Sequence, residues 1–174
     1  MLTPEKHKKL FLVDGSALAY RSHFAFIRNP LFNSKGENTS AVFGFTKALL
    51  KILDDESPDY MAVVFDHPKP TFRHQAYADY KATRQKMPED MAEQLPRIKE
   101  AIEAFHIPIL EIPGFEADDV MGTLAKKAES EGLTIYLVTG DKDFMQLVSP
   151  AIKIYNPKRS GEEAEVVDET GVRE

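Results

Sequence analysis

Apolar residues gather in five short runs that alternate with helical or loop-like stretches. The runs are 10–13, 60–65, 107–112, 133–138 and 152–155. Continuous apolar runs of this length are typical of strands buried on both faces of a parallel sheet. Pro108 places the third strand at a sheet edge or at a strand start, because proline cannot donate to a strand ladder. The pattern therefore predicts a largely buried sheet.

Between these runs, apolar residues recur at the i, i+3 and i+4 spacing of a helix with one buried face. The expected helices are 17–26, 41–52, 88–105, 117–128 and a short one at 142–148. Strands that alternate with helices predict an α/β fold with a mostly parallel central sheet and helices on both faces. Residues 71–87 show little periodicity, and we expect a helical arch or a flexible basic segment there. No repeat or linker is visible, so residues 1–174 are expected to form a single domain.

The amino-acid composition is that of an ordinary globular protein and excludes only a few classes. With 174 residues, 43% hydrophobic and 29% charged, the chain is expected to be globular, soluble and large enough for a proper core. No run approaches the roughly 18 apolar residues of a membrane span, and the run after the N-terminal lysines is too short for a signal peptide. The absence of cysteine excludes disulfides and thiolate metal sites. We expect a cytoplasmic protein without a membrane partner, and the oligomeric state stays open.

Acidic residues follow four of the predicted strands. They are Asp14, Asp66, Glu116, Asp118, Asp119, Asp141 and Asp143. A single acid in such a place is commonly a helix cap, and acids are favoured at helix N-termini. Seven at one edge of a sheet would repel one another unless a cation neutralised them, and carboxylate oxygens suit Mg²⁺ or Mn²⁺. Two such ions, about 3.5–4 Å apart, stabilise phosphoryl displacement, so the residues favour metal-dependent hydrolysis of a phosphoester.

The segment after Asp66 mixes basic and aromatic side chains. It contains Lys69, Phe72, Arg73, His74, Tyr77, Tyr80, Lys81, Arg84 and Lys86. Basic residues contact phosphates and aromatic rings stack on bases, so the segment is a candidate nucleic-acid contact; a solvated surface loop is the alternative. Arg21 could add a phosphate contact or form a surface salt bridge. The net charge of −6 does not exclude a polyanionic substrate, because bound metal ions would offset it.

Several short motifs occur together and in order. They are 12–15, 19–21, 64–66, 72–74, 80–84, 114–119 and 139–143. In this combination the chain resembles the 5′-nuclease domain of bacterial DNA polymerase I, a member of the flap endonuclease superfamily with a PIN-like, resolvase-like fold. The resemblance covers essentially the whole chain. It implies a hydrolase, a 5′-3′ exonuclease or flap endonuclease that removes 5′ flaps and RNA primers from DNA in replication and repair, near the nucleoid.

The resemblance also implies roles for individual residues. The first metal ion would be held by Asp14, Asp66, Glu116 and Asp118. The second would take ligands from Asp118, Asp119, Asp141 and Asp143. Lys81 and Arg84 would be catalytic, engaging the scissile phosphate from the base of a helical arch. The nucleic-acid-binding set would be Arg21, Arg73, Tyr80, Lys81, Arg84 and Lys86.

The end of the sequence departs from the family pattern. The family continues with a Gly-Asp-x-x-Asp segment and a helix-three-turn-helix element, and then with a polymerase domain in the same chain. The sequence ends at Glu174 without them, so we expect an incomplete second metal site and weak or undetectable flap cleavage by this chain alone. Two alternatives stay open, namely a free-standing PIN-type ribonuclease and a DNA-binding module without catalysis.

Overall fold

Six strands form one sheet in the computed structural model, which describes residues 7–77, 79–82, 86–157 and 164–173. The strands are β1 (Lys9–Asp14), β2 (Tyr60–Val64), β3 (Ile109–Leu110), β4 (Thr134–Val138), β5 (Ile152–Asn156) and β6 (Glu165–Val167). Their order is β3-β2-β1-β4-β5-β6, and all neighbours are parallel except β5 and β6. The expected mostly parallel sheet is therefore confirmed, and β3 lies at its edge as Pro108 indicated.

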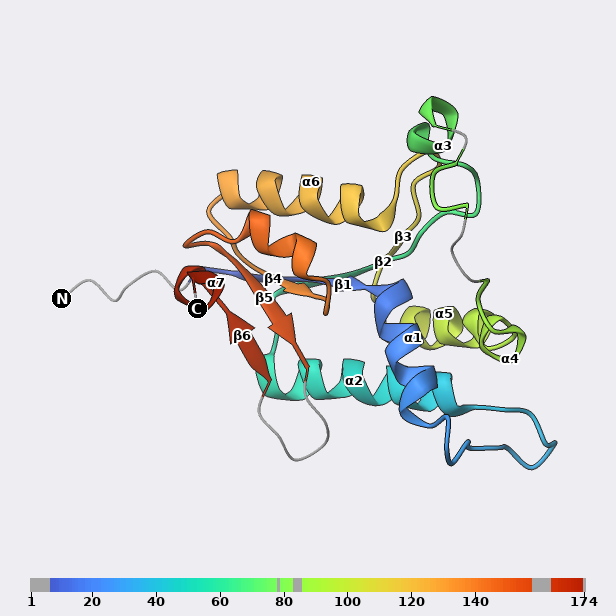
Figure 1. Ribbon diagram of the computed structural model, residues 1–174. Helices are drawn as coiled ribbons and strands as arrows, with labels where there is room; N and C mark the ends of the chain where they lie inside the picture. Colours follow the sequence, from blue (N-terminus) through green and yellow to red (C-terminus); the bar gives the residue numbers. More distant parts are fainter. Residues whose placement is uncertain (1–6, 78, 83–85, 158–163, 174) are drawn as a thin grey trace.

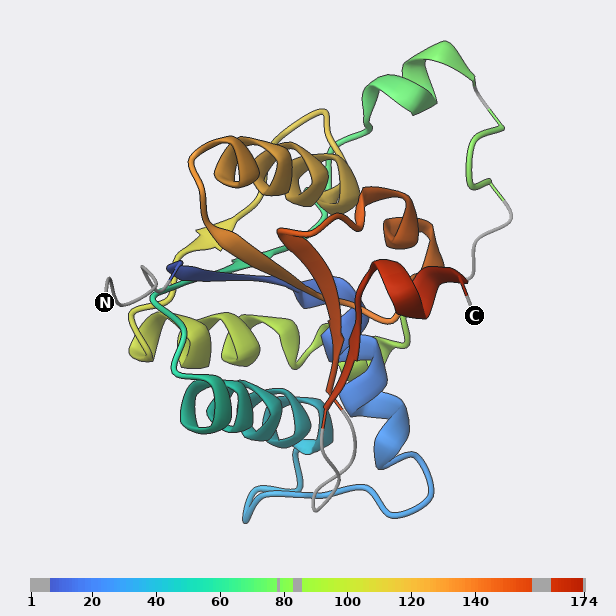
Figure 2. The same cartoon turned by 90° about the vertical axis from the view of Figure 1, so that its left-hand side faces the viewer.

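Helices cover both faces of this sheet (Figures 1 and 2). They are α1 (Gly15–Ala25), α2 (Ser40–Glu56), α3 (Phe72–Ala76), α4 (Glu89–Ala92), α5 (Leu95–Ala104), α6 (Ala117–Ser130), the 3₁₀ helix η1 (Lys142–Leu147) and α7 (Glu169–Arg173). α1, α2 and α5 lie on one face, and α6 and η1 lie on the other. None of the helices in the described ranges is long and apolar enough to cross a bilayer.

Alternate residues of β1 supply the two halves of the core. Phe11 and Val13 pack with α1, α2 and α5, whereas Leu12 packs with α6. All three are buried, as expected for a central strand whose successive side chains point to opposite faces. The sheet is thus fixed between two apolar layers, and its carboxyl edge is held at a defined place.

The helix expected at 88–105 is divided in two. Gln94 is buried between α4 and α5, and its side-chain oxygen accepts a hydrogen bond from the backbone N–H of Ala41 at 2.9 Å. Its amide nitrogen donates to the carbonyl of Asp90 at 2.8 Å. Pro96, in the first turn of α5, has no N–H to continue a helix from α4. The periodicity was correct, but these contacts favour two helices over one.

One other expectation about elements needs correction. The strand expected at 107–112 contains only Ile109–Leu110, which pairs with Val63 and Val64 at the sheet edge. The stretch 71–87, expected to be a helical arch or a flexible basic segment, contains the five-residue helix α3. Thr71 begins this helix, and the Nδ1 atom of His74 lies 2.8 Å from the Thr71 hydroxyl. A cap of this kind favours a short helix that apolar periodicity cannot reveal.

Candidate nuclease site

The carboxyl ends of the parallel strands bring the predicted acids to one edge of the sheet. Asp14 is the last residue of β1, Asp66 follows β2 closely, and Asp141 follows β4. The N-terminus of α6 lies at the same edge (Figure 1). Open α/β sheets bind ligands at this edge, so the fold places the acids where a site is expected.

Asp14 is held in place by two hydrogen bonds. Its carboxylate accepts from the backbone N–H of Ala17 at 2.8 Å, which caps α1, and from the hydroxyl of Thr139 at 3.4 Å. Burial raises the pKa of Asp14, and the negative charges of Asp66 and Asp141 act in the same direction. The two hydrogen bonds oppose the rise but do not cancel it. Asp14 is therefore a buried carboxylate under electrostatic strain.

Asp66 connects the beginnings of two helices. One oxygen accepts from the N–H of Ala117 in the first turn of α6 at 2.9 Å, and the other accepts from the Ser16 hydroxyl at 3.3 Å. Backbone N–H groups at a helix N-terminus are free to bind an anion, and the helix dipole favours negative charge there. Asp66 therefore fixes α6 relative to α1.

Two hydroxyl residues of the site were missed by the sequence reasoning. Thr139 is buried; its hydroxyl donates to Asp14 and accepts from the N–H of Asp141 at 3.1 Å. Ser16 donates to Asp66 in the same way. Each lies two positions from an acid that follows a strand, and this spacing is the signal that could have revealed them.

Asp118 has a strongly raised pKa. Loss of hydration raises the pKa of Asp118 to about 6, and nearby negative charges add to the rise. Those charges belong to Asp14, Asp141 and Asp66. We call Asp14, Asp66, Asp118 and Asp141 the acid cluster, because they are close enough to perturb one another.

The acid cluster has the chemistry of a site for a hard divalent cation. It offers only carboxylate oxygens, and its excess negative charge is relieved by a bound cation or a proton. Within the described ranges, no group of three or more acidic or histidine side chains already has the spacing of a formed metal site. The donor set therefore fits Mg²⁺ or Mn²⁺ in type and charge, and its role as a ligand set stays a prediction.

Glu116 and Asp119 face basic groups instead of the acid cluster. Glu116 accepts from the Lys81 ammonium at 2.8 Å and from the Tyr80 hydroxyl at 3.1 Å. The Asp119 carboxylate accepts one hydrogen bond from each terminal nitrogen of the Arg73 guanidinium, both at 2.7 Å. The turn after α3 therefore lies against the N-terminus of α6, and it brings a lysine beside the predicted metal ligands.

Lys81 carries a firmly held positive charge at this point. Burial lowers the pKa of Lys81, but the hydrogen bond to Glu116 and that carboxylate's charge outweigh it, so the net shift is upward. The Lys81 backbone has φ of 55°, in the left-handed region that non-glycine residues seldom adopt. Contacts around the turn must maintain this conformation.

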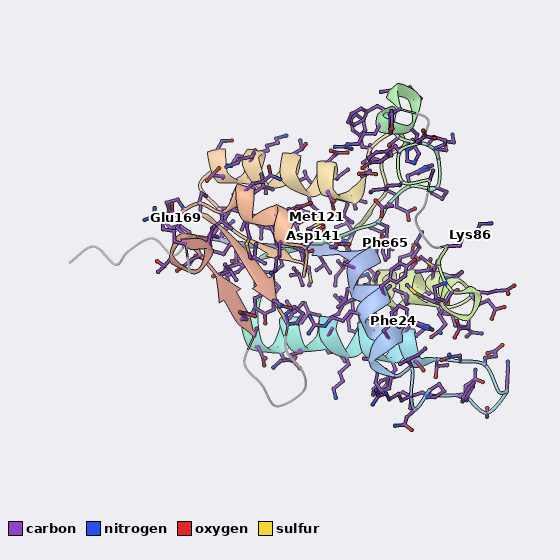
Figure 3. All side chains as sticks on the ribbon, viewed as in Figure 1. Phe24, Phe65, Lys86, Met121, Asp141 and Glu169 are labelled. Atoms are coloured by element: carbon purple, nitrogen blue, oxygen red, sulfur yellow. The ribbon has the colours of Figure 1, made fainter. Side chains whose placement is uncertain are left out.

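Three further residues of the predicted site do not contact the acid cluster through a hydrogen bond of their side chains in the described part of the chain, or lie outside it. Asp143 donates its backbone N–H to Asp141 at 2.9 Å, and a metal-binding role for its side chain stays a prediction. Lys86 is exposed on the connection to α4 (Figure 3). Arg84 lies outside the described residues, so its predicted role is untested.

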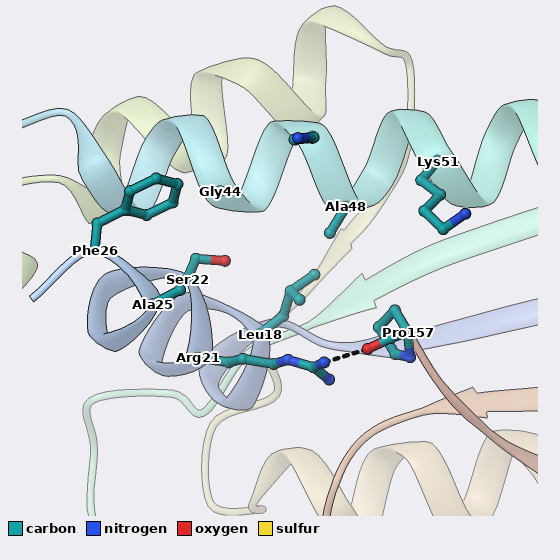
Figure 4. A pocket seen from close by; sticks show the side chains of 10 residues that line it. Leu18, Arg21, Ser22, Ala25, Phe26, Gly44, Ala48, Lys51 and Pro157 are labelled. Carbon is teal, nitrogen blue, oxygen red and sulfur yellow. Dashed lines mark hydrogen bonds between the residues drawn. The ribbon is translucent and has the colours of Figure 1, made fainter. Parts of the chain in front are cut away.

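Arg21 lies in a groove between α1 and α2 (Figure 4). Its guanidinium donates to the side chain of Asn156 at 2.8 Å and to the carbonyl of Pro157. The groove has a volume of about 410 Å³, and Lys47 and Lys51 of α2 also line it. These contacts tie Arg21 to the end of β5, and a phosphate contact would have to share the guanidinium with them.

Comparison with known proteins gives a consistent assignment. The family model described as the 5′-3′ exonuclease N-terminal resolvase-like domain matches residues 9–174. DNA polymerase I of Bacillus caldotenax is 45% identical over 168 residues, which cover 96% of this chain and 19% of that protein. The 5′-3′ exonuclease of Aquifex aeolicus is 45% identical over 150 residues, covering 86% of this chain and 51% of that protein. The chain thus spans about a fifth to a half of the length of these relatives.

Solved structures show the same fold at lower identity. The T5 5′-exonuclease with bound zinc matches with a TM-score of 0.67 and 21% identity, over 91% of this chain and 58% of that one. The catalytic core of Rad2 in complex with a DNA substrate matches with a TM-score of 0.54 and 19% identity, over 95% of this chain and 49% of that one. The expected PIN-like architecture is confirmed by these likenesses. Because the family model matches nearly the whole sequence, the chain belongs to the family of 5′-3′ exonuclease N-terminal, resolvase-like domains.

Proposed function

We propose that this chain is the metal-binding part of a structure-selective 5′ nuclease that hydrolyses phosphodiesters at DNA flaps and 5′ ends and at RNA primers on DNA. The observation that carries the proposal is the acid cluster, in which the pKa of Asp118 is raised to about 6 beside three other carboxylates. Perturbed acids at the carboxyl edge of an α/β sheet are typical of a catalytic site. Family membership adds the 5′-3′ direction.

Two groups of residues would have separate roles in the reaction. The acid cluster would supply oxygen ligands, and bound Mg²⁺ or Mn²⁺ would polarise the phosphodiester and lower the pKa of an attacking water. Lys81 would place its ammonium near the phosphate charge that develops during the reaction. This ammonium donates a hydrogen bond to Glu116 at 2.8 Å, so a phosphate would have to compete with that carboxylate for it.

The turn after α3 would contribute shape as well as charge. The Tyr80 ring lies 5.2 Å from the ring of His74, edge to face, while its hydroxyl binds Glu116. This arrangement fixes one aromatic face beside the site, and stacking on a base is the sequence-tolerant contact that such a face offers. We propose that this turn forms part of the base of the arch.

Cleavage of a labelled 5′-flap DNA by residues 1–174, with Mg²⁺ and with Mn²⁺, tests the proposal. We expect slow cleavage that needs metal, is lost in Asp118→Ala, and is retained in Asp55→Ala. Asp55 is the matched control because its carboxylate pairs with Lys51 at 2.6 Å on α2, away from the acid cluster. Single-stranded RNA serves as the second substrate. Preference for RNA would favour a free-standing ribonuclease, and metal-independent DNA binding without turnover would refute the nuclease proposal.

A further inference from the structure

The segment that leaves β2 is attached to the turn before α6 through two neighbouring contacts. The backbone N–H of Phe72 donates to the carbonyl of Gly114 at 3.1 Å. The ring of Phe72 lies 6.0 Å from that of Phe115. Both contacts are on the surface, because each ring is about half exposed, so they orient the segment without burying it deeply.

Arg73 makes the strongest contact in this attachment. Its Nη1 and Nη2 atoms donate to Oδ2 and Oδ1 of Asp119, each at 2.7 Å, and Nη1 also lies 3.4 Å from a Glu116 oxygen. The guanidinium lies 4.5 Å from the centroid of the Phe72 ring. A paired, parallel arrangement of this kind is among the strongest charge-assisted hydrogen bonds in proteins.

Both oxygens of the Asp119 carboxylate accept hydrogen bonds in this arrangement. Oδ1 accepts from Arg73, and Oδ2 accepts from Arg73 and from the backbone N–H of Glu116 at 3.0 Å. A metal ion at Asp119 would have to displace the guanidinium from these two oxygens.

We infer that Asp119 and Arg73 form a positioning pair, and that Asp119 is not a metal ligand and Arg73 is not a phosphate contact. The pair fixes α3 to α6, and the turn that follows α3 then places Tyr80 and Lys81 on Glu116. The inference rests on the proposed nuclease function, because it assigns these residues to the placement of Lys81. The left-handed backbone at Lys81 needs such an external restraint.

Metal titration distinguishes the role of Asp118 from that of Asp119. Calorimetry with Mn²⁺ on the 174-residue chain should show that Asp118→Asn weakens binding by at least about tenfold, whereas Asp119→Asn changes it by less than about threefold. Asparagine keeps the shape of aspartate, and circular dichroism checks that both variants fold. Equal losses of affinity in the two variants would overturn the inference.

Cleavage kinetics tests the positioning role. Arg73→Ala and Asp119→Ala should each lower kcat by about 10- to 100-fold, because a displaced Lys81 is poorly aligned, with a smaller change in KM. The double variant should be no slower than either single variant, since both remove one unit. Arg73→Lys should recover only part of the rate, because lysine cannot form the paired contact. Additive losses, or a loss confined to KM, would contradict the inference.

Hydrogen exchange in metal-free protein decides the question without turnover. The amides of His74 and Tyr77 bond within α3, and Asp119→Asn should speed their exchange by about tenfold. Arg97→Ala is the matched control, since Arg97 pairs with Glu37 at 3.1 Å on another surface. Unchanged exchange at α3 would overturn the inference. If the wild-type chain cleaves no DNA but Asp119→Asn frees α3, the proposed function fails and the positioning pair stands.

Discussion

Relative to wild type, Asp118→Asn should be more stable without metal and less stable with metal. The substitution replaces a carboxylate by an amide of the same shape, and it removes a charged group whose pKa is raised by lost hydration and by the neighbouring acids. Without metal the amide should stabilise the fold, since no charge is left to repel. With metal the carboxylate should stabilise it, since binding to the folded state adds free energy.

The magnitude follows from the perturbed pKa. A rise in the pKa of Asp118 from 3.8 to about 6 corresponds to roughly 3 kcal/mol if the charge were unscreened. Asp118 is exposed, and solvent screening reduces this to about 1 kcal/mol. Loss of a carboxylate from the first turn of α6 costs about 0.5 kcal/mol of helix-dipole interaction. The variant should therefore be more stable by about 0.5 kcal/mol, or about 1–2 °C in Tm.

The pH dependence has a definite sign. Because the pKa of Asp118 is higher in the folded protein than in the unfolded chain, the folded protein binds more protons between these two values, and stability falls as pH rises through them. Above about pH 7 the repulsion is complete and the variant gains its full advantage. Below about pH 3, one unit under the unfolded value of 3.8, Asp118 is protonated in both states, so wild type and variant should melt alike.

Thermal unfolding with a chelator, and then with Mg²⁺ or Mn²⁺, measures both effects. At a metal concentration of about 100 times Kd, wild type should gain roughly 2.7 kcal/mol that the variant largely lacks, so the order of Tm values reverses. Asp55→Asn, in the exposed pair with Lys51, should show neither the pH dependence nor the reversal. A metal-free Asp118→Asn that melts below wild type at about pH 7.5 would refute the reasoning.

Three further predictions address separate parts of the structure. Lys81→Met should lower the single-turnover cleavage rate by about 100-fold and leave Mn²⁺ affinity unchanged in calorimetry; an unchanged rate would remove Lys81 from the chemistry. Gly44→Val should lower the free energy of unfolding in urea by about 2 kcal/mol, because its Cβ would lie 2.9 Å from that of Ser22 where α1 crosses α2. By contrast, the Cβ of Gly122→Ala in the interior of α6 would meet only Leu147 at 3.4 Å, and this variant should be more stable by about 0.5–1 kcal/mol. Thr139→Val should cost about 1 kcal/mol in urea unfolding, and an unaltered midpoint would show that the buried hydroxyl bridge contributes nothing.

The sheet was predictable because its signal is local. The apolar runs that became β1, β2 and β4 lie on consecutive residues, and burial on both faces requires such runs. The division between α4 and α5 was not predictable, because it depends on Gln94 bonding to Ala41, which is 53 positions away. Apolar periodicity predicts which face of a helix is buried. It cannot predict that a polar side chain such as Gln94 will interrupt a helix by bonding to a different helix.

The acids of the site were predictable in place but not in orientation. A residue that ends a parallel strand must lie at the carboxyl edge, so Asp14 and Asp141 could be assigned there from the apolar runs alone. Their partners could not be assigned, since the Thr139 hydroxyl contacts Asp14 across 125 positions. The resemblance to 5′ nucleases names residue types that recur together, and it contains no information about which oxygen faces which donor.

Asp118 and Asp119 show why orientation decides chemistry. They are adjacent acids in the first turn of α6, and a composition argument treats them alike. Successive residues of a helix are rotated by about 100°, so one carboxylate faces the acid cluster while the other faces Arg73, which is 46 positions away. Within one turn of α6, Asp118 therefore lies near the other acids, where we propose that a cation binds, and Asp119 is paired with a guanidinium. The environment of each carboxylate, more than its residue type, determines its role.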